Sequence, residues 1–174
     1  NVVVIGGGPA GMEAAMVAAQ RGHQVTLFEK EDHLGGKLIF SRQVEFKKVL
    51  ENFMDYQIHM LDKLGVTVKL STEAAPDMVE AMAPDAVIAA VGADAVIPPI
   101  PGVDGEHVIT AEQCYHKGLV GEEMGENIAV LGGGLVGCET ALYLAEEGHE
   151  VTVIEMAPEI AMETTAAHRR ALKV

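Results

Sequence analysis

The sequence is poor in positive charge and contains no long apolar run. Among its 174 residues, 12 Lys and Arg side chains stand against 26 Asp and Glu side chains, which gives a formal net charge of −14. Nucleic acids and anionic membrane surfaces are bound through clustered Lys and Arg, so neither is expected as a partner. No apolar run approaches the roughly 20 residues of a membrane-spanning helix, so no membrane partner is expected either. Acidic surfaces are common among enzymes, so the charge excludes partners without selecting a function.

Cysteines are scarce, and the histidines form no cluster. Cys114 and Cys138 lie far apart and outside any C-x-x-C spacing, so neither a disulfide framework nor a zinc site is expected. The seven histidines show no metal-ligand spacing, and no Ser-His-Asp or Cys-His arrangement indicates a catalytic group. We therefore expect no metal site, no catalytic side chain, and two reduced, buried thiols in a cytoplasmic protein.

Small and apolar residues, by contrast, are plentiful. The chain has 19 glycines and an apolar share of 49% with only 4% aromatics, which suits a tightly packed α/β protein. The all-apolar run at residues 2–5 is typical of a parallel strand buried on both faces. We expect a Rossmann-like parallel sheet with helices on both faces, built from strands at 2–5, 23–30, 65–72 and 85–92 (the last again buried on both faces) and helices at 9–21, 44–64 and 77–83.

A glycine-rich phrase occurs twice. The run "VVVIGGGPAGMEAA" at residues 2–15 returns as "IAVLGGGLVGCETA" at residues 128–141. Between the copies, residues 92–105 hold three prolines and three glycines, so they cannot form regular structure. Because the two copies are 126 positions apart, the repeat indicates duplicated domains rather than a solenoid. A constant offset of 126 positions places Gly6, Gly8, Gly11 and Glu29 on Gly132, Gly134, Gly137 and Glu155.

Each copy is a G-x-G-x-x-G run between a strand and a helix, with an acid at the end of the following strand. The first glycine makes the tight turn, the second lets the backbone approach a pyrophosphate, and the third lets the helix pack on the sheet. The phosphates bind free N–H groups at the positive end of the helix dipole. The acid accepts hydrogen bonds from the adenosine ribose. The sequence therefore predicts two dinucleotide sites.

The order "GGGPAG", "FEK", "LGGKL", "VIAAVGADAVIPPIPG" and "GGGLVG" resembles the two-dinucleotide-binding-domain flavoproteins, which include the pyridine nucleotide-disulfide oxidoreductases. The resemblance covers the whole chain and implies that the first copy binds FAD. Val91 stands where the family's second FAD motif has Thr, which removes any hydroxyl contact there. The FAD residues that the resemblance implies are Gly6, Gly8, Pro9, Ala10, Gly11, Glu29, Lys30, Gly36, Lys37, Leu38, Glu73, Ala74, Val91 and Gly92.

The second copy resembles the NAD(P)H domain of the same flavoproteins. Its acid is followed by a methionine rather than by the Arg that serves a 2′-phosphate, so NADH is favoured. The NAD(H) residues implied are Gly132, Gly134, Leu135, Val136, Gly137, Glu155 and Met156. We divide the chain into an FAD-binding part at 1–121 and the first β-α-β half of an NAD(H)-binding domain at 122–174.

The stretch after the glycine loop, "LGGKLIFSRQVEFKK", contains no cysteine pair, which argues against disulfide exchange. It is more similar to the C-terminal flavin modules of the NADH:flavin oxidoreductases, the group of 2-enoate reductase, 2,4-dienoyl-CoA reductase and trimethylamine dehydrogenase. That resemblance implies hydride transfer from NADH to FAD. It also implies an N-terminal barrel with FMN and a 4Fe-4S cluster, which receives the electrons and reduces an activated C=C bond.

Two alternatives remain open. The module could hold ADP as a non-redox structural ligand, as in the trimethylamine dehydrogenase branch, or it could be a flavoprotein like the small subunit of glutamate synthase. Both ends of the sequence read as cut, so we expect a truncated second unit and a fragment that is inactive alone. We expect such a fragment to pack its second β-α-β unit onto the first sheet or to self-associate.

Overall fold

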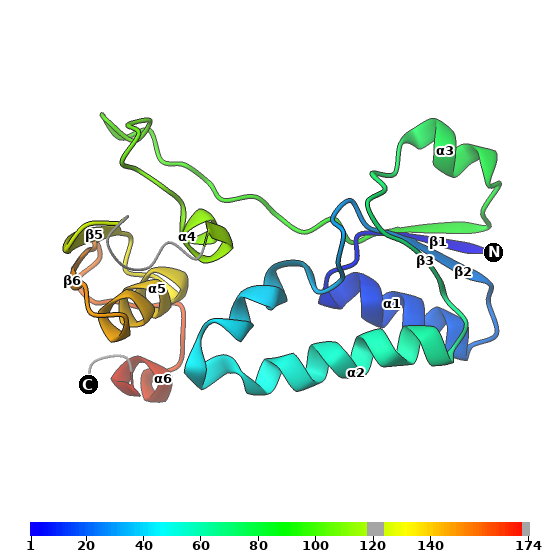
Figure 1. The fold of residues 1–174 in the computed structure, drawn as a ribbon, viewed down its shortest axis with the longest axis horizontal. Helices are drawn as coiled ribbons and strands as arrows, with labels where there is room; N and C mark the ends of the chain where they lie inside the picture. Colours follow the sequence, from blue (N-terminus) through cyan, green and yellow to red (C-terminus); the bar gives the residue numbers. More distant parts are fainter. Residues whose placement is uncertain (118–123, 172–174) are drawn as a thin grey trace. The chain divides into compact units, whose positions relative to one another are not determined.

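The computed structural model describes residues 1–117 and 124–171, and these form two compact units (Figure 1). Unit 1 comprises Asn1–Asp94 and unit 2 comprises Ala95–Val174. Within the described residues, the strands form two sheets, one of four strands and one of two. The expected boundary at 121/122 falls within residues 118–123, outside the described part of the chain.

Unit 1 is built on a parallel sheet in the order β3-β2-β1-β4. The central strand β1 pairs with β2 on one side, where Val2 lies opposite Val25, and with β4 on the other, where Val2 lies opposite Ala86. Because the strands are parallel, their carboxyl ends meet at one edge of the sheet. The strand bounds are β1 Val2–Ile5, β2 Val25–Phe28, β3 Thr67–Lys69 and β4 Ala86–Ala89.

Helices cover both faces of this sheet, as the sequence predicted (Figure 1). On one face, α1 (Pro9–Gln20) and α2 (Val49–Lys63) bury Met12, Met54 and Leu61 against the strands. On the other face, the short helix α3 (Pro76–Ala81) places Val79 against Val3 and Phe28. Two separate apolar clusters therefore fix both sides of the strands that carry the glycine loop.

Two sequence-based expectations for unit 1 were wrong in detail. Strand β4 was expected to be buried on both faces, but it is an edge strand, and the side chain of Val87 is 49% exposed. A central strand and an edge strand can have the same apolar composition, so the sequence does not distinguish them. The helix expected from residue 44 begins only at Val49, after two 3-10 helices, η1 (Gly36–Arg42) and η2 (Glu45–Lys47).

Unit 2 repeats the first β-α-β of unit 1 with β5 (Asn127–Leu131), α5 (Leu135–Glu146) and β6 (Glu150–Ile154). The two parallel strands pair in register, with Ile128 opposite Val151. Helix α4 (Ala111–Lys117) packs against α5, where the Tyr115 hydroxyl donates to Thr140 Oγ1 at 3.2 Å. A last short helix, α6 (Ala166–Ala171), follows β6.

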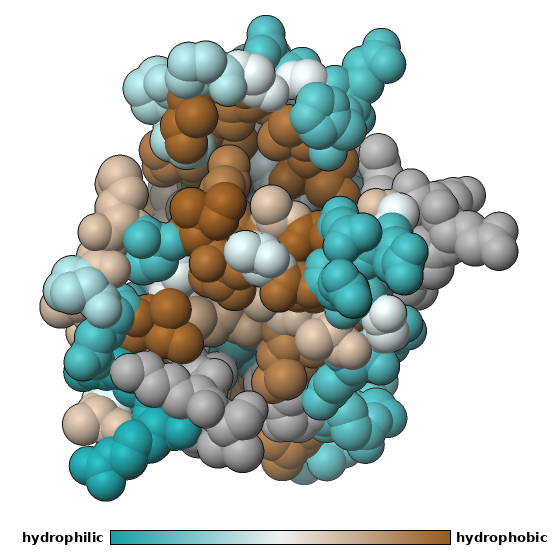
Figure 2. Space-filling model, turned by 90° about the vertical axis from the view of Figure 1, so that its left-hand side faces the viewer, coloured by the Kyte–Doolittle hydropathy of each residue, from teal (hydrophilic) through white to brown (hydrophobic). Residues whose placement is uncertain are grey.

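The surface of unit 2 carries apolar side chains among polar ones (Figure 2). Large exposed side chains include Leu131 and Ile154 at the ends of its strands and Val136 at the start of α5. Among the described residues, no helix is long and apolar enough to cross a membrane.

Candidate dinucleotide sites

The first and third glycines of each copy are required by the backbone itself. Gly6 has a φ of +104°, and Gly132 has a φ of +102°, a left-handed conformation that glycine adopts readily. A Cβ on Gly11 would overlap the carbonyl oxygen of Gly6, and a Cβ on Gly137 would overlap that of Gly132. The first and third glycine roles predicted from the sequence are therefore present in both units.

The second glycine of unit 1 lies beside an open space. Gly8 is the N-cap of α1, with ordinary extended backbone angles (φ −71°, ψ 178°) and no capping side chain. A Cβ at this position would meet only the Cα of Gly36, at 3.9 Å. The first N–H groups of α1 thus face a cradle that a side chain would fill, which fits a phosphate at the helix N-terminus. Pro9 at the first helical position contributes no N–H, and Ala10 is exposed.

The strand-end acid is hydrogen-bonded to the glycine loop in both units. Glu29 is buried; its Oε2 accepts the Gly7 N–H at 2.6 Å and its Oε1 accepts the Glu31 N–H at 2.9 Å. In unit 2, Glu155 Oε2 accepts the Gly133 N–H at 2.6 Å, and its Oε1 accepts the Ala157 N–H at 2.6 Å.

These backbone bonds orient each acid before any ligand arrives. The N–H groups of Ala157 and then Gly133 hold the pKa of the Glu155 carboxyl below its ordinary 4.5. Gly7 and Gly133 were missed by sequence reasoning, because the motif leaves the middle glycine of each G-G-G run unspecified.

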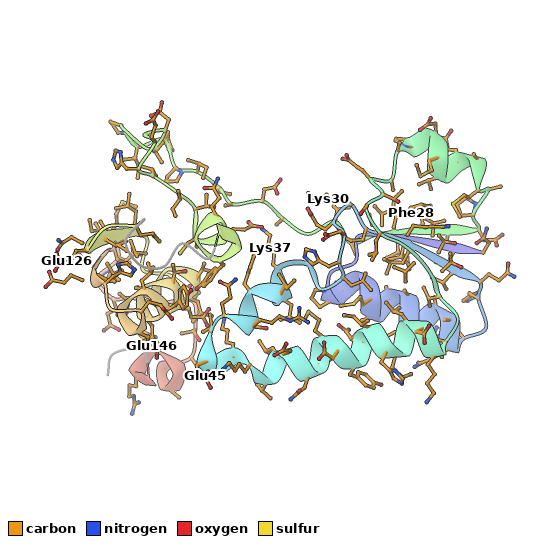
Figure 3. All side chains as sticks on the ribbon, viewed as in Figure 1. Phe28, Lys30, Lys37, Glu45, Glu126 and Glu146 are labelled. Atoms are coloured by element: carbon orange, nitrogen blue, oxygen red, sulfur yellow. The ribbon has the colours of Figure 1, made fainter. Side chains whose placement is uncertain are left out.

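The loop after β2 folds back over the glycine turn. The Gly35 N–H donates to the Gly7 carbonyl at 2.9 Å, and a Cβ on Gly36 would lie 2.9 Å from the Cα of Gly8. Leu38 packs against the α1–α2 core, while the exposed Lys37 Nζ donates to the carbonyl of Ala93 (Figure 3). Of the expected loop residues, Gly36 therefore lies next to the cradle, whereas Lys37 contacts the segment after β4 and Leu38 lies against the core.

Residues expected near the adenine lie beside the acid. The Thr72 N–H donates to the Glu29 carbonyl at 2.8 Å, which brings the next two residues to the end of β2. There Glu73 is exposed, whereas Ala74 packs into the α3-side cluster. Lys30 is exposed directly after the acid (Figure 3).

The segment after β4 also reaches the glycine turn. The Ala90 N–H donates to the Ile5 carbonyl at 2.8 Å, and a Cβ on Gly6 would overlap the Ala90 carbonyl. Val91 follows with 73% of its side chain exposed, and Gly92 adopts a φ of +78°. Unit 1 thus brings all of its expected segments to the carboxyl edge of its sheet, and their arrangement fits a dinucleotide.

The N-terminus of α5 in unit 2 differs from that of α1 in one respect. The Leu135 N–H donates to Glu163 Oε1, and a Cβ on Gly134 would lie 2.9 Å from that same oxygen. Val136 is 64% exposed beside it, and Met156 is fully exposed after the strand-end acid. The backbone of unit 2 fits a dinucleotide as unit 1 does, but a carboxylate of the chain lies at the cradle. The sequence interpretation did not include Glu163.

A family model described as pyridine nucleotide-disulphide oxidoreductase matches residues 1–173. The chain belongs to this family. Membership in it supports dinucleotide cofactors for this chain.

Relatives of this pyridine nucleotide-disulphide oxidoreductase chain confirm the resemblance to the NADH:flavin oxidoreductase group. The chain is 44% identical over 164 residues to NADH oxidase of Thermoanaerobacter brockii and 46% identical over 173 residues to bilirubin reductase of Mediterraneibacter gnavus. These matches cover 94% and 99% of this chain but 25% and 26% of the relatives.

A solved structure of 2-naphthoyl-CoA reductase superposes with a TM-score of 0.89 at 36% identity, covering 98% of this chain and 26% of that one. The chain therefore spans about a quarter of the length of these relatives.

The family name refers to disulphide chemistry, but the cysteines of this member are not arranged for it. Cys114 and Cys138 are both free and buried. Burial raises the pKa of both thiols, and the Cys138 Sγ donates to the Gly133 carbonyl at 3.3 Å. A reactive cysteine needs a lowered pKa and access to solvent. Their environment is therefore that of structural residues.

Proposed function

We propose that this chain is the FAD- and NADH-binding module of a flavin oxidoreductase, with FAD in unit 1 and NADH in unit 2. The duplicated cradle supports this proposal: two glycine turns, two helix N-termini and two strand-end acids recur at one fixed offset. The bound cofactors supply the redox chemistry, hydride transfer from nicotinamide to flavin. The chain contributes binding and orientation, and we assign it no catalytic side chain.

In unit 1, the N-terminus of α1 and the open side of Gly8 bind the pyrophosphate of FAD, and Glu29 binds the adenosine ribose. The acid keeps lone pairs beyond those engaged by Gly7 and Glu31, because a carboxylate offers about four acceptor sites. The segments at Glu73 and at Val91 border the same edge of the sheet. We retain residues 1–121 as the FAD-binding part, which comprises unit 1 and the first residues of unit 2.

In unit 2, residues 122–174 supply the corresponding first half of an NAD(H)-binding domain. Glu155 is followed by Met156 and Ala157, so no positive side chain stands directly after the acid to receive a 2′-phosphate. A carboxylate disfavours that phosphate by charge repulsion and accepts ribose hydroxyls instead. The preferred coenzyme is therefore NADH.

The complete protein passes electrons from this module to a barrel domain with FMN and a 4Fe-4S cluster, which reduces an activated C=C bond. Two observations support this wider proposal: the relatives are named reductases and oxidases, and they are about four times longer than this chain. The exposed edge strand β4 supports self-association of this chain when it stands alone. A cytoplasmic location agrees with the two free thiols.

The test uses two reciprocal variants of the purified chain, reconstituted with FAD and titrated with NADH. Gly8→Ala fills the cradle of unit 1 without backbone strain, since the φ of Gly8 is −71°. It should abolish the yellow flavin absorbance while the folded circular dichroism persists. Gly134→Ala should weaken NADH binding and leave FAD bound. A colourless wild-type protein that releases ADP would refute the redox role and favour the structural alternative, and flavin retained by Gly8→Ala would refute the assignment of unit 1.

A further inference from the structure

The two nucleotide cradles are covered by equivalent loops that carry opposite charges. In unit 1 the Gly35 N–H donates to the Gly7 carbonyl, and in unit 2 the Ala161 N–H donates to the Gly133 carbonyl at 2.6 Å. These donors lie 126 positions apart, so the structural repeat extends beyond the strand-end acids. Two residues further on, the same offset places Glu163 opposite Lys37.

The two side chains make different contacts. Lys37 lies on the unit 1 loop and donates to the carbonyl of Ala93, and a Cβ on Gly8 would meet only the Cα of Gly36. Glu163 turns onto the N-terminus of α5, where it accepts the Leu135 N–H next to Gly134. That N–H belongs to the first residue of a 12-residue helix, at the positive end of its dipole. A carboxylate there uses the same donor and the same field that would bind a phosphate.

The backbone beneath Glu163 is held in an unusual conformation. Ala161 is buried and has a φ of +49°, a left-handed conformation that costs a non-glycine residue about 1–2 kcal/mol. The equivalent residue in unit 1 is Gly35, which adopts a φ of +117°. A strained backbone conformation persists where contacts with the surrounding structure hold it in place. The hydrogen bond from Ala161 to the glycine loop and the contact from Glu163 to α5 therefore hold this segment against the cradle together.

We propose that Glu163 is a built-in competitor of the dinucleotide pyrophosphate at the N-terminus of α5 in unit 2. The inference rests on the proposed function, because it takes the α5 N-terminus as the place where NADH phosphates bind. NADH binding then displaces Glu163 from the Leu135 N–H. The competing carboxylate weakens binding and speeds release, as a coenzyme that must leave after each turnover requires.

The test compares three variants of the full chain by calorimetric titration with NADH. Glu163→Ala removes the competitor, and its dissociation constant should fall about tenfold, the worth of one charge-assisted hydrogen bond. Glu163→Asp keeps the charge but shortens the reach, so it should bind NADH more tightly than wild type. Glu146→Ala, at the opposite end of α5 (Figure 3), removes one charge away from the cradle and should bind as wild type does.

A second readout separates the inference from the proposed function. In the ligand-free wild type, the Leu135 amide should be protected from hydrogen exchange, and Glu163→Ala should remove this protection until NADH is added. Equal NADH affinity in wild type and Glu163→Ala would overturn the inference and leave the proposed function standing. Tighter binding by Glu163→Ala alone, with Glu163→Asp unchanged, would assign the effect to charge and overturn direct competition. Failure of every variant to bind NADH would overturn the proposed function itself.

Discussion

Replacing the buried acid of unit 1 tests whether it supports the fold as well as the ligand. In Glu29→Ala the Gly7 N–H loses its acceptor inside the protein, and the Glu31 N–H loses its acceptor nearer the surface. A buried unsatisfied donor costs about 1–3 kcal/mol, whereas water can replace much of the outer bond. We therefore expect the free energy of unfolding to fall by about 2–4 kcal/mol, before any cofactor is considered.

The assay is urea unfolding followed by circular dichroism and extrapolated linearly to water, together with residue-resolved hydrogen exchange. Exchange should quicken at the Gly7 and Glu31 amides and remain unchanged at Gly133, whose acceptor Glu155 is intact. Glu29→Gln keeps one acceptor and should fall between the variant and wild type. A Glu29→Ala protein within about 0.5 kcal/mol of wild type, with the Gly7 amide still protected, would refute this account of the acid.

Three further predictions concern stability, pH and thiol reactivity. Gly11→Ala and Gly137→Ala should each destabilise their unit by about 3 kcal/mol or more in denaturant titrations, because the new methyl overlaps a carbonyl of the preceding turn; near-neutral unfolding energies would contradict this. The hydrogen bonds that lower the pKa of Glu155 stabilise unit 2 fully above the ordinary value of 4.5, and this stabilisation is lost as the pH falls through the lower folded pKa. The protection factors of the Gly133 and Ala157 amides, taken against the intrinsic exchange rate at each pH, should therefore fall on acidification, and they should fall less in a Glu155→Gln control. Cys114 and Cys138 should react with a thiol reagent only after denaturation, and rapid labelling of the native chain would show that their burial is incomplete.

The repeat could be predicted from the sequence because the local backbone geometry requires its glycines and places its acids. Gly6 and Gly11 are forced by one tight turn, and an acid at the end of β2 lies next to that turn in any parallel β-α-β unit. The exposure of Val87 could not be predicted, since it depends on which strand lies at the sheet edge. The contact of Glu163 with Leu135 could not be predicted either, because the loop sequence does not determine the direction of the Glu163 side chain. Constraints on the local backbone can thus be predicted from the sequence, whereas side-chain contacts between residues far apart in the chain cannot.

The hydrogen bonds of Glu155 have a consequence for redesigning coenzyme preference. A change to NADPH requires removing the carboxylate that repels a 2′-phosphate, yet this carboxylate also fixes the Gly133 and Ala157 amides. Replacement of Glu155 by alanine or arginine would remove the acceptor of these two amides and loosen the loop that has to bind the new coenzyme. A short acceptor such as serine or asparagine at position 155, combined with an arginine at position 156, would restore an acceptor to the loop and supply the positive charge from a neighbouring position. We therefore expect a change of coenzyme to require substitutions at positions 155 and 156 together.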